Sequence, residues 1–367
     1  MAAAEKRTRV LIVDDSAFMR KVLEEIIRTD PRLEVVGQAK DGREAVSMAQ
    51  SLQPDVMTMD INMPHMDGLE ATQHIMTQNP RPIVIVSSES RQGAASTLRA
   101  LELGAIDFVT KPSSGIDLDM KTVRDELLSK LRMAAKVRVV RTAAQHDRST
   151  AVQAKFQAQP AKEVGNSEPR LPLVVIAAST GGPATLMRLI PRFPKDFPAA
   201  VVLVQHMPAT FTSQLSLQLT EVASIRVKEA EANEALQAGT FYVCPGSHHL
   251  RISLTGRIKL DDGPRISGYR PCADEAFESA AAYGGANVVG VVLTGMGNDG
   301  AKGVQVLKAA RGWVLAQDEA TSVIFGMPAE AIQTGVVDQV VGIDEMYGAI
   351  EKYLNSICRQ TQPIGSR

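Results

Sequence analysis

Two groups of chemically reactive side chains stand out in this chain of 367 residues, and they lie in different halves. The first combines acidic residues with a hydroxyl and an amine: Asp14, Asp15, Asp60, Ser87 and Lys111. The second has the residue types of a serine-hydrolase triad: Ser179, His206 and Asp299. The first set suits transfer of a phosphoryl group to a carboxylate, and the second suits attack of a serine on a carbonyl.

The acidic group has a coherent chemistry. Clustered carboxylates repel one another and can hold a hard divalent cation such as Mg²⁺. The cation would neutralise an incoming phosphoryl group and orient it toward Asp60. Lys111 supplies a compact positive charge, and the Ser87 hydroxyl can donate to a phosphoryl oxygen. A single aspartate is more often a helix cap or a loop carboxylate, and we interpret Asp41 and Asp67 in that way.

Ser179 lies in the segment 178–183 (ASTGGP), between an apolar strand candidate and a helical pattern. Its two glycines allow a tight turn, and the helix start behind them favours developing negative charge. Such a turn could instead cradle a phosphate, but it has neither GxGxxG nor GK[ST]. The GxSxG elbow is also absent, which argues against a standard α/β-hydrolase.

His206 ends the apolar run AAVVLVQH, so we expect it at the same sheet edge as Ser179. Asp299 lies in LTGMGNDG, just past the apolar run NVVGVVL, and is the candidate that orients the histidine. An amide of that loop, such as that of Met296, could form part of an oxyanion hole. Two other acidic residues are weaker candidates, interpreted as caps or surface charges: Asp274 and Asp318.

Alternating strand and helix patterns must position the first group. The strand candidates are 9–13, 33–39, 56–59, 83–86 and 107–109, and the helix candidates are 17–28, 42–51, 68–77, 93–103 and 117–135. Five such repeats predict a flavodoxin-like (βα)5 domain with a parallel sheet. Functional groups of such sheets gather at the carboxyl ends of the strands, where the acidic group falls.

A second alternation begins near residue 171. The strand candidates are 173–177, 200–204, 240–243, 288–293 and 313–316, and the helix candidates are 183–190, 272–283, 300–310 and 327–334. They predict a doubly wound, mostly parallel α/β domain, with a hairpin from 243–260 added to its sheet. The polar, Ala/Gln-rich stretch between the two patterns is typical of a linker. We therefore predict domains at 1–135 and 171–367, joined by a linker at 136–170.

Composition limits the partners. Lys and Arg number 40 against 41 Asp and Glu, which gives no electrostatic support for binding nucleic acid or an anionic membrane. The three cysteines contain no CxxC pair, which argues against a disulfide framework or a zinc site. No apolar run approaches the roughly 18 residues of a membrane span. We expect a cytoplasmic protein without direct membrane insertion.

The stretches VLIVDDSAFMR, MDINMPHMDGLE, VIVSSES and DFVTKP closely resemble the receiver domain of bacterial response regulators. The resemblance implies that a histidine kinase phosphorylates Asp60. It also implies a set of Mg²⁺ ligands that includes one main-chain carbonyl: Asp14, Asp15, Asp60 and Asn62. In that family a hydroxyl residue and an aromatic residue relay phosphorylation to one surface, and here they match Ser87 and Phe108. Phe108 could equally be a core aromatic residue.

The stretches AASTGGP, QHMPATFT, LTGMGNDG and AQDEATSVIFGMP resemble the catalytic domain of the chemotaxis response-regulator protein-glutamate methylesterases. The resemblance implies Ser179 as nucleophile, His206 as general base and Asp299 as its orienter, with the Met296 amide at the oxyanion position. The segment 269–274 (YRPCAD) departs from the more usual Arg-Pro-Ser-Val-Asp of the family. Within it, we interpret Cys272 as a small packed residue rather than a second nucleophile.

Both resemblances together imply a phosphorylation-activated hydrolase. It would demethylate γ-glutamyl methyl esters on chemoreceptors, releasing methanol, and would also deamidate receptor glutamines, with no cofactor for hydrolysis. The unphosphorylated receiver would cover the active-site face. The alternative is a non-catalytic adaptor that binds receptors under receiver control, which the intact Ser/His/Asp set disfavours. A DNA-binding regulator is disfavoured because the second domain has no helix-turn-helix pattern and no basic stripe.

Overall fold

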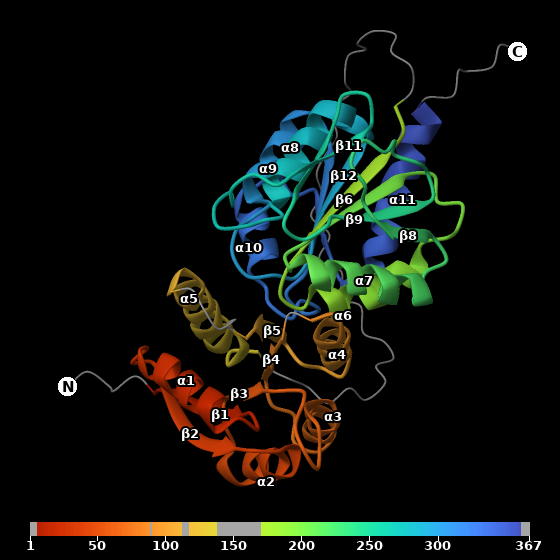
Figure 1. Cartoon of the computed structure of the whole chain (residues 1–367). Helices are drawn as coiled ribbons and strands as arrows, with labels where there is room; N and C mark the ends of the chain where they lie inside the picture. Colours follow the sequence, from red (N-terminus) through yellow and green to blue (C-terminus); the bar gives the residue numbers. More distant parts are fainter. Residues whose placement is uncertain (1–5, 89, 112–116, 138–169, 361–367) are drawn as a thin grey trace, which may run out of the picture.

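The computed structural model describes residues 6–88, 90–111, 117–137 and 170–360, which form two α/β units, each built on its own parallel sheet (Figure 1). The predicted linker lies outside the described residues except at its ends. No helix within the described residues is long and apolar enough to cross a lipid bilayer.

The N-terminal unit has a five-stranded sheet in the order β2-β1-β3-β4-β5, with every pair parallel. Its strands are β1 Thr8–Val13, β2 Leu33–Ala39, β3 Val56–Met59, β4 Ile83–Ser87 and β5 Asp107–Thr110. Its helices are α1 Ala17–Arg28, α2 Gly42–Leu52, α3 Gly68–Gln78, α4 Arg91–Glu102 and α5 Asp117–Ala134. The central strands β3 and β4 are buried on both faces, as their mostly apolar sequences predict. The flavodoxin-like prediction is confirmed.

Two acidic residues of this unit cap helices, as the sequence predicts. Asp41 accepts from the amide of Glu44 at 2.9 Å, at the start of α2. Asp67 accepts from the amide of Glu70 at 2.8 Å, at the start of α3. Each bond satisfies an amide that a helix terminus would otherwise leave unpaired.

The C-terminal unit has a seven-stranded sheet in the order β14-β13-β12-β6-β7-β9-β8, and all its strand pairs are parallel. Its strands are β6 Leu173–Ala178, β7 Ala200–Gln205, β8 Arg226–Glu229, β9 Thr240–Val243, β12 Val288–Val292, β13 Trp313–Gln317 and β14 Gln339–Val341. Its helices are α6 Gly182–Leu189, α7 Ala209–Val222, α8 Ala273–Gly284, α9 Ala301–Ala309, α10 Met327–Gln333 and α11 Ile343–Gln360. The predicted doubly wound α/β fold is confirmed.

The predicted hairpin differs in one respect. β10 (His249–Ile252) and β11 (Ile258–Asp261) pair with each other in a separate antiparallel sheet and do not extend the main one. The hairpin packs on α8 instead, where the amide of Ile252 donates to the Ser279 hydroxyl at 2.9 Å. One edge of the main sheet is formed by β8, a short charged strand, and the other by β14; the sequence analysis predicted neither.

The two units meet along one apolar surface. Helix α4 packs against α6 and α7, next to β5 (Figure 1). The ring of Phe108 in β5 stacks on Phe211 in α7, with centroids 4.2 Å apart and planes 13° apart. Both residues belong to one continuous cluster of buried apolar side chains that runs through both units. The contact between the units is therefore packed like a domain interior.

We predict opposite changes in stability when two helical glycines are replaced by alanine. In α9, a Cβ on Gly303 would lie 2.7 Å from the Cβ of Phe277, so Gly303→Ala should force α8 and α9 apart and lower the free energy of unfolding by about 1–3 kcal/mol. In α11, a Cβ on Gly348 would meet nothing within 4 Å, so Gly348→Ala should raise it by about 0.5–1 kcal/mol. Urea unfolding followed by circular dichroism measures both. Equal effects of the two substitutions would contradict the close contact at Gly303.

Candidate functional site

The acidic group lies at the carboxyl edge of the first sheet. Asp14 follows β1 and Asp60 follows β3, and these two strands are neighbours. The Nζ atom of Lys111, just past β5, lies 2.9 Å from Asp14 Oδ2 and 3.0 Å from Asp60 Oδ2. The start of α3 closes on this edge through Gly68, where a Cβ would lie 2.0 Å from the carbonyl oxygen of Asp60.

The electrostatics of this pocket favour a bound cation. Burial raises the pKa of the Asp60 carboxyl, and the charge of Asp14 adds to the effect while Lys111 opposes it. Burial also opposes the charge of Lys111, but its bonds to Asp14 and Asp60 outweigh burial and raise its pKa. Asp14, Asp15 and Asp60 each offer an oxygen, and these oxygens lie within 4.8 Å of one another. An all-oxygen donor set of this kind suits Mg²⁺.

The remaining predicted receiver residues are placed as follows. Ser87 is buried at the end of β4, and its hydroxyl donates to the Gly93 carbonyl at 3.3 Å, toward α4. Asn62 is exposed two residues after Asp60. Phe108 is neither a simple core residue nor a free surface group, because it packs against the other unit. A role for Asn62 as a metal ligand stays a prediction.

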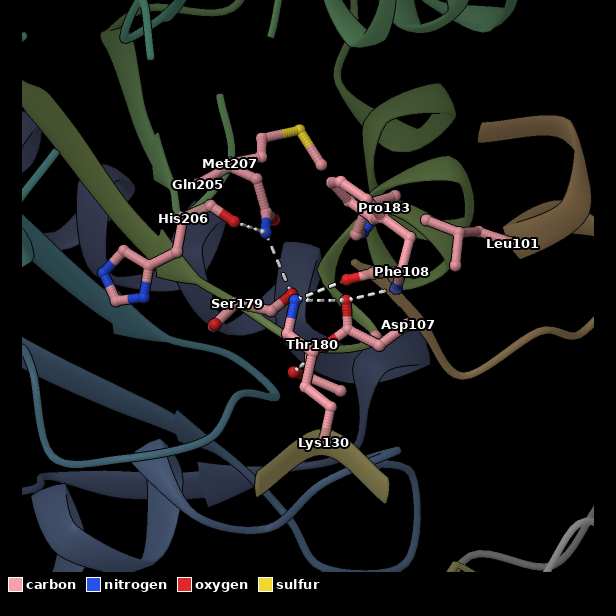
Figure 2. Close-up of a pocket in the computed structure, with 11 residues that line it drawn as sticks. Leu101, Asp107, Phe108, Lys130, Ser179, Thr180, Pro183, Gln205, His206 and Met207 are labelled. Carbon is pink, nitrogen blue, oxygen red and sulfur yellow. Dashed lines mark hydrogen bonds and ion pairs between the residues drawn. The ribbon is translucent and has the colours of Figure 1, made fainter. Parts of the chain in front are cut away.

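The structure places the second group at the topological switch point of the second sheet. β6 lies between β7 and β12, and the strand order reverses there. Ser179 follows β6, His206 follows β7, and Asp299 lies in the loop between β12 and α9. Crevices outside such points are where open α/β sheets bind ligands. Figure 2 shows Ser179 and His206 beside the cavity at this edge.

Backbone contacts fix these loops to one another. The Ser179 amide donates to Thr294 at 3.0 Å, and the His206 amide donates to Ala178 at 3.1 Å. The Gln205 side chain donates from Nε2 to the Ser179 carbonyl at 2.9 Å, a positioning role that the sequence analysis missed (Figure 2). Its only signal was a polar residue at the end of an apolar strand.

His206 and Asp299 form a close pair. Nε2 of His206 lies 2.7 Å from Oδ2 of Asp299, and both side chains are largely buried. With the proton on Nε2 facing the carboxylate, the lone pair is left on Nδ1, which is buried and has no partner among the described residues. With this tautomer, Nδ1 is the ring nitrogen left to accept a proton, and no hydrogen bond joins it to the Ser179 hydroxyl in the described residues. The ring of Tyr269 stacks on it, with centroids 4.4 Å apart.

Several hydrogen-bond donors surround the carboxylate of Asp299. Its carboxylate accepts from the amides of Ala273 at 2.7 Å and Asp274 at 3.0 Å, and from the Cys272 thiol at 3.2 Å. Burial would raise the pKa of Asp299, but the bond and charge of His206, with the two amides, hold it below its ordinary value. Asp299 therefore stays ionised opposite the histidine.

Cys272, Asp274 and Asp299 also have the residue types and spacing of a metal site. Their oxygens do not suit a cation, however. The carboxylate of Asp299 faces the amides at the start of α8, and Oδ1 of Asp274 faces the amides of Gly300 and Gly303 at the start of α9. Helix N-termini carry partial positive charge and repel cations. We infer that the cluster stabilises the negative charge of Asp299 and does not hold a metal.

Backbone amides suitable for an oxyanion lie near Ser179. Within the described residues, the amides of Thr180 and Met296 donate to no other group. Met296 belongs to the loop that carries Asp299, as the sequence predicts. Its sulfur accepts from the Ser129 hydroxyl of α5 at 3.5 Å, so the N-terminal unit reaches this loop.

The N-terminal unit also reaches the loop of Ser179. Thr180 donates its hydroxyl hydrogen bond to Asp107, at the start of β5 (Figure 2). Burial opposes the charge of Lys130, but Asp107 and Glu126 outweigh it and keep its pKa above the ordinary value. Lys130 lies 3.2 Å from Asp107 and donates to the Phe108 carbonyl at 2.6 Å. No sequence signal connected Asp107 with Thr180, because the bond depends on how the two units dock.

Comparison with known proteins matches this two-part structure. The family model described as CheB methylesterase matches residues 174–350, and the response regulator receiver domain model matches residues 10–124. A protein-glutamate methylesterase/protein-glutamine glutaminase of Pyrococcus horikoshii is 46% identical over 362 residues, with 96% of this chain and 95% of that protein covered. That of Symbiobacterium thermophilum is 46% identical over 353 residues, with 95% and 97% covered.

The chain belongs to the protein-glutamate methylesterase/protein-glutamine glutaminase family. As a member of this family it is an enzyme, and the alternative of a non-catalytic adaptor is not favoured. Among solved structures, the Thermotoga maritima CheB methylesterase catalytic domain is 39% identical, covers 50% of this chain and 98% of that one, and has a TM-score of 0.48. The response regulator domain of Thermotoga maritima CheB is 52% identical, covers 36% and 99%, and has a TM-score of 0.34.

Cys272 places a thiol beside the triad, 3.2 Å from Asp299, and we predict that it is inert. Burial and the charge of Asp299 raise the pKa of its thiol to about 12, and 1% of its surface is exposed. Thiols react as thiolates, so iodoacetamide at pH 8 should leave hydrolysis unchanged. Cys272→Ser, which keeps a donor to Asp299, should retain activity within about threefold. Inactivation by either treatment would make Cys272 a participant.

Proposed function

We propose that this enzyme hydrolyses γ-glutamyl methyl esters on the cytoplasmic helices of chemoreceptors, with Ser179 as nucleophile, His206 as general base and Asp299 as its orienter. The pair of His206 and Asp299, 2.7 Å apart beside Ser179 at the switch point of the sheet, is the observation that carries the proposal. The donor set around Asp299 supports it further, because that set keeps the carboxylate ionised.

The reaction proceeds in two halves. The Ser179 hydroxyl oxygen attacks the ester carbonyl carbon while its proton moves to Nδ1 of His206. The imidazolium formed is stabilised by Asp299, and the charge on the carbonyl oxygen is stabilised by the amide of Met296. His206 then returns the proton to the leaving methanol, which leaves an acyl-enzyme. A water molecule, with a proton taken by His206, attacks the acyl carbon; His206 then returns that proton to the Ser179 oxygen as the acyl–oxygen bond breaks, which releases the glutamate side chain and free Ser179.

Deamidation of receptor glutamines needs no further group. The side-chain amide of glutamine has the same carbonyl and chain length as the methyl ester. His206 would protonate the amide nitrogen as the C–N bond breaks, so that ammonia leaves in place of methanol. The two activities in the names of the relatives are therefore consistent with one set of residues.

We propose that Mg²⁺ serves phosphorylation and not hydrolysis. Asp14, Asp15, Asp60 and the Asn62 carbonyl would hold the ion, which would orient the phosphoryl group of the donor toward Asp60. Lys111 would contact the phosphoryl oxygens once Asp60 is phosphorylated. The carboxylates of the cluster around Asp299 face the amides of helix N-termini, an arrangement that disfavours a cation.

Regulation follows from how the two units pack. The cavity beside Ser179 and His206 is also lined by Leu101, Asp107 and Phe108 of the N-terminal unit (Figure 2). Its volume of about 20 Å³ is large enough for one water molecule but too small for a glutamyl side chain with its ester. We propose that this structure corresponds to the repressed form, and that phosphorylation of Asp60 weakens the contact of Phe108 with Phe211.

The domain limits follow the same proposal: receiver at 1–135, linker at 136–170 and catalytic domain at 171–367. The phosphodonor would be the histidine kinase of the same chemotaxis system, and the enzyme would act from the cytoplasm. Neither activity requires nucleic acid or insertion into the membrane.

Ser179→Ala tests the nucleophile. We expect methanol release from methylated receptor membranes to fall on the order of 10⁶-fold, because a triad acts as a unit. The fold and the phosphorylation of Asp60 should be unchanged. Ser356→Ala, on the exposed face of α11, is the matched control and should keep full activity. Activity within tenfold of wild type in Ser179→Ala would require a different nucleophile.

Phe108→Ala tests repression. Removing a ring that stacks at 4.2 Å should lower the stability of the closed arrangement by about 1–2 kcal/mol and raise unphosphorylated activity roughly 5- to 30-fold. Phe18→Ala makes the same change at a ring that is 74% exposed, and it should leave unphosphorylated activity unchanged. Asp60→Asn should respond to no phosphodonor. If Phe108→Ala were less active than wild type, the receiver would be a docking module and not an inhibitor.

A further inference from the structure

Two helices that begin beside the triad exchange their capping carboxylates. The amides of Ala273 and Asp274, at the start of α8, donate to Asp299, which lies just before α9. In return, the amides of Gly300 at 2.9 Å and Gly303 at 2.7 Å, at the start of α9, donate to Oδ1 of Asp274. Each helix therefore supplies the acceptor for the other.

Asp274 does not cap its own helix, and it is not a free surface charge. The N-cap of α8 is Cys272, and it makes no side-chain cap bond. Burial and the charge of Asp299 raise the pKa of Asp274, while the amides of Gly303 and Gly300 oppose them. A half-buried carboxylate near a second one carries a cost in stability, and helix capping at α9 alone could be met by a residue of α9's own loop.

The placement of Asp274 bears directly on Asp299. Gly300 is the next residue after Asp299, and it has a φ of +97°. The bond from the Gly300 amide to Asp274 holds the peptide group that joins these two residues. Gly303 brings α9 close, since a Cβ there would lie 2.9 Å from the Cα of Asp274. The backbone that carries Asp299 is thus fixed against α8 at two points.

We propose that Asp274 is a positioning residue for the hydrolysis, which holds Asp299 in line with Nε2 of His206 through the amides of Gly300 and Gly303. This inference rests on the proposed triad. Asp299 can stabilise the imidazolium only while its Oδ2 stays near 2.7 Å from Nε2. A shift of about 1 Å in such a group can cost 10²-fold in rate. The side chain of Asp274 bonds to the amides of Gly300 and Gly303 and not to His206, so we expect its effect to appear in kcat and not in KM.

The hydrogen-bond pattern provides a sharp test. Both amides donate to the same oxygen, Oδ1, so Asp274→Asn can keep both bonds through its amide oxygen while it loses the charge. Asp274→Ala loses both bonds. We would assay the full-length protein, phosphorylated with an acyl phosphate in Mg²⁺, on a peptide that carries a glutamate γ-methyl ester. Asp274→Ala should lower kcat roughly 10- to 100-fold with KM within twofold, whereas Asp274→Asn should retain kcat within about threefold.

The controls separate this inference from loss of stability and from failure of the triad. Asp338→Ala removes another half-buried carboxylate that accepts a backbone amide, that of Val314 at 2.9 Å, and it should keep kcat. If Asp274→Ala does not fold, Asp274→Ser replaces it, because a hydroxyl is too short to reach both amides and the same fall in kcat is expected.

Two outcomes would overturn the inference: full kcat in folded Asp274→Ala or Asp274→Ser, or an Asp274→Asn variant as impaired as Asp274→Ala. Asp299→Ala distinguishes the two levels of the argument. If Asp299→Ala is inactive while Asp274→Ala is normal, the positioning role fails and the triad stands. If Asp299→Ala remains active, the triad itself fails.

Discussion

The buried negative charge of Asp299 has to be matched by donors, and much of the carboxyl edge of the second sheet is built around that requirement. An unpaired buried carboxylate would take up a proton and could no longer orient a base. Here the first amides of α8, the Cys272 thiol and the His206 ring surround it. The start of α8 must therefore lie beside the loop after β12, and the close packing at Gly303 makes this possible.

The contact between the two units also contains a buried carboxylate, that of Asp107, which must be matched by donors. Asp107 is buried in that contact and receives Lys130 and the Thr180 hydroxyl. One of these partners belongs to the receiver and the other to the loop of the nucleophile. The N-terminal unit thus does more than cover a surface, because it supplies an acceptor to the residue that follows Ser179. Release of this contact would change the surroundings of Ser179 as well as its exposure.

Much of this arrangement could be predicted from sequence, for a definite physical reason. Ser179, His206 and Asp60 each end an apolar strand, and parallel strands bring their carboxyl ends to one edge. Residues whose role depends on how distant segments pack together showed no pattern in the sequence that could have revealed that role. The stacking of Tyr269 on His206 and the bond of Asp107 to Thr180 join segments far apart in the chain. Asp274 was interpreted as a cap or surface charge, and it is a cap, but of the neighbouring helix. The strand β8 was not predicted because its sequence, RVKE, is mostly charged and shows little of the apolar alternation that indicates a strand.

Because Phe108 and Phe211 stack in an apolar contact, the proposed equilibrium between closed and open enzyme depends on temperature. Separating the two units exposes both rings and the apolar side chains around them to water, so opening carries a positive change in heat capacity. Hydrophobic attraction weakens on cooling. The apolar part of the contact between the receiver and the catalytic unit therefore becomes weaker as the temperature falls. On the proposed regulation, a larger fraction of open enzyme at low temperature would offset part of the slowing of ester cleavage by cold.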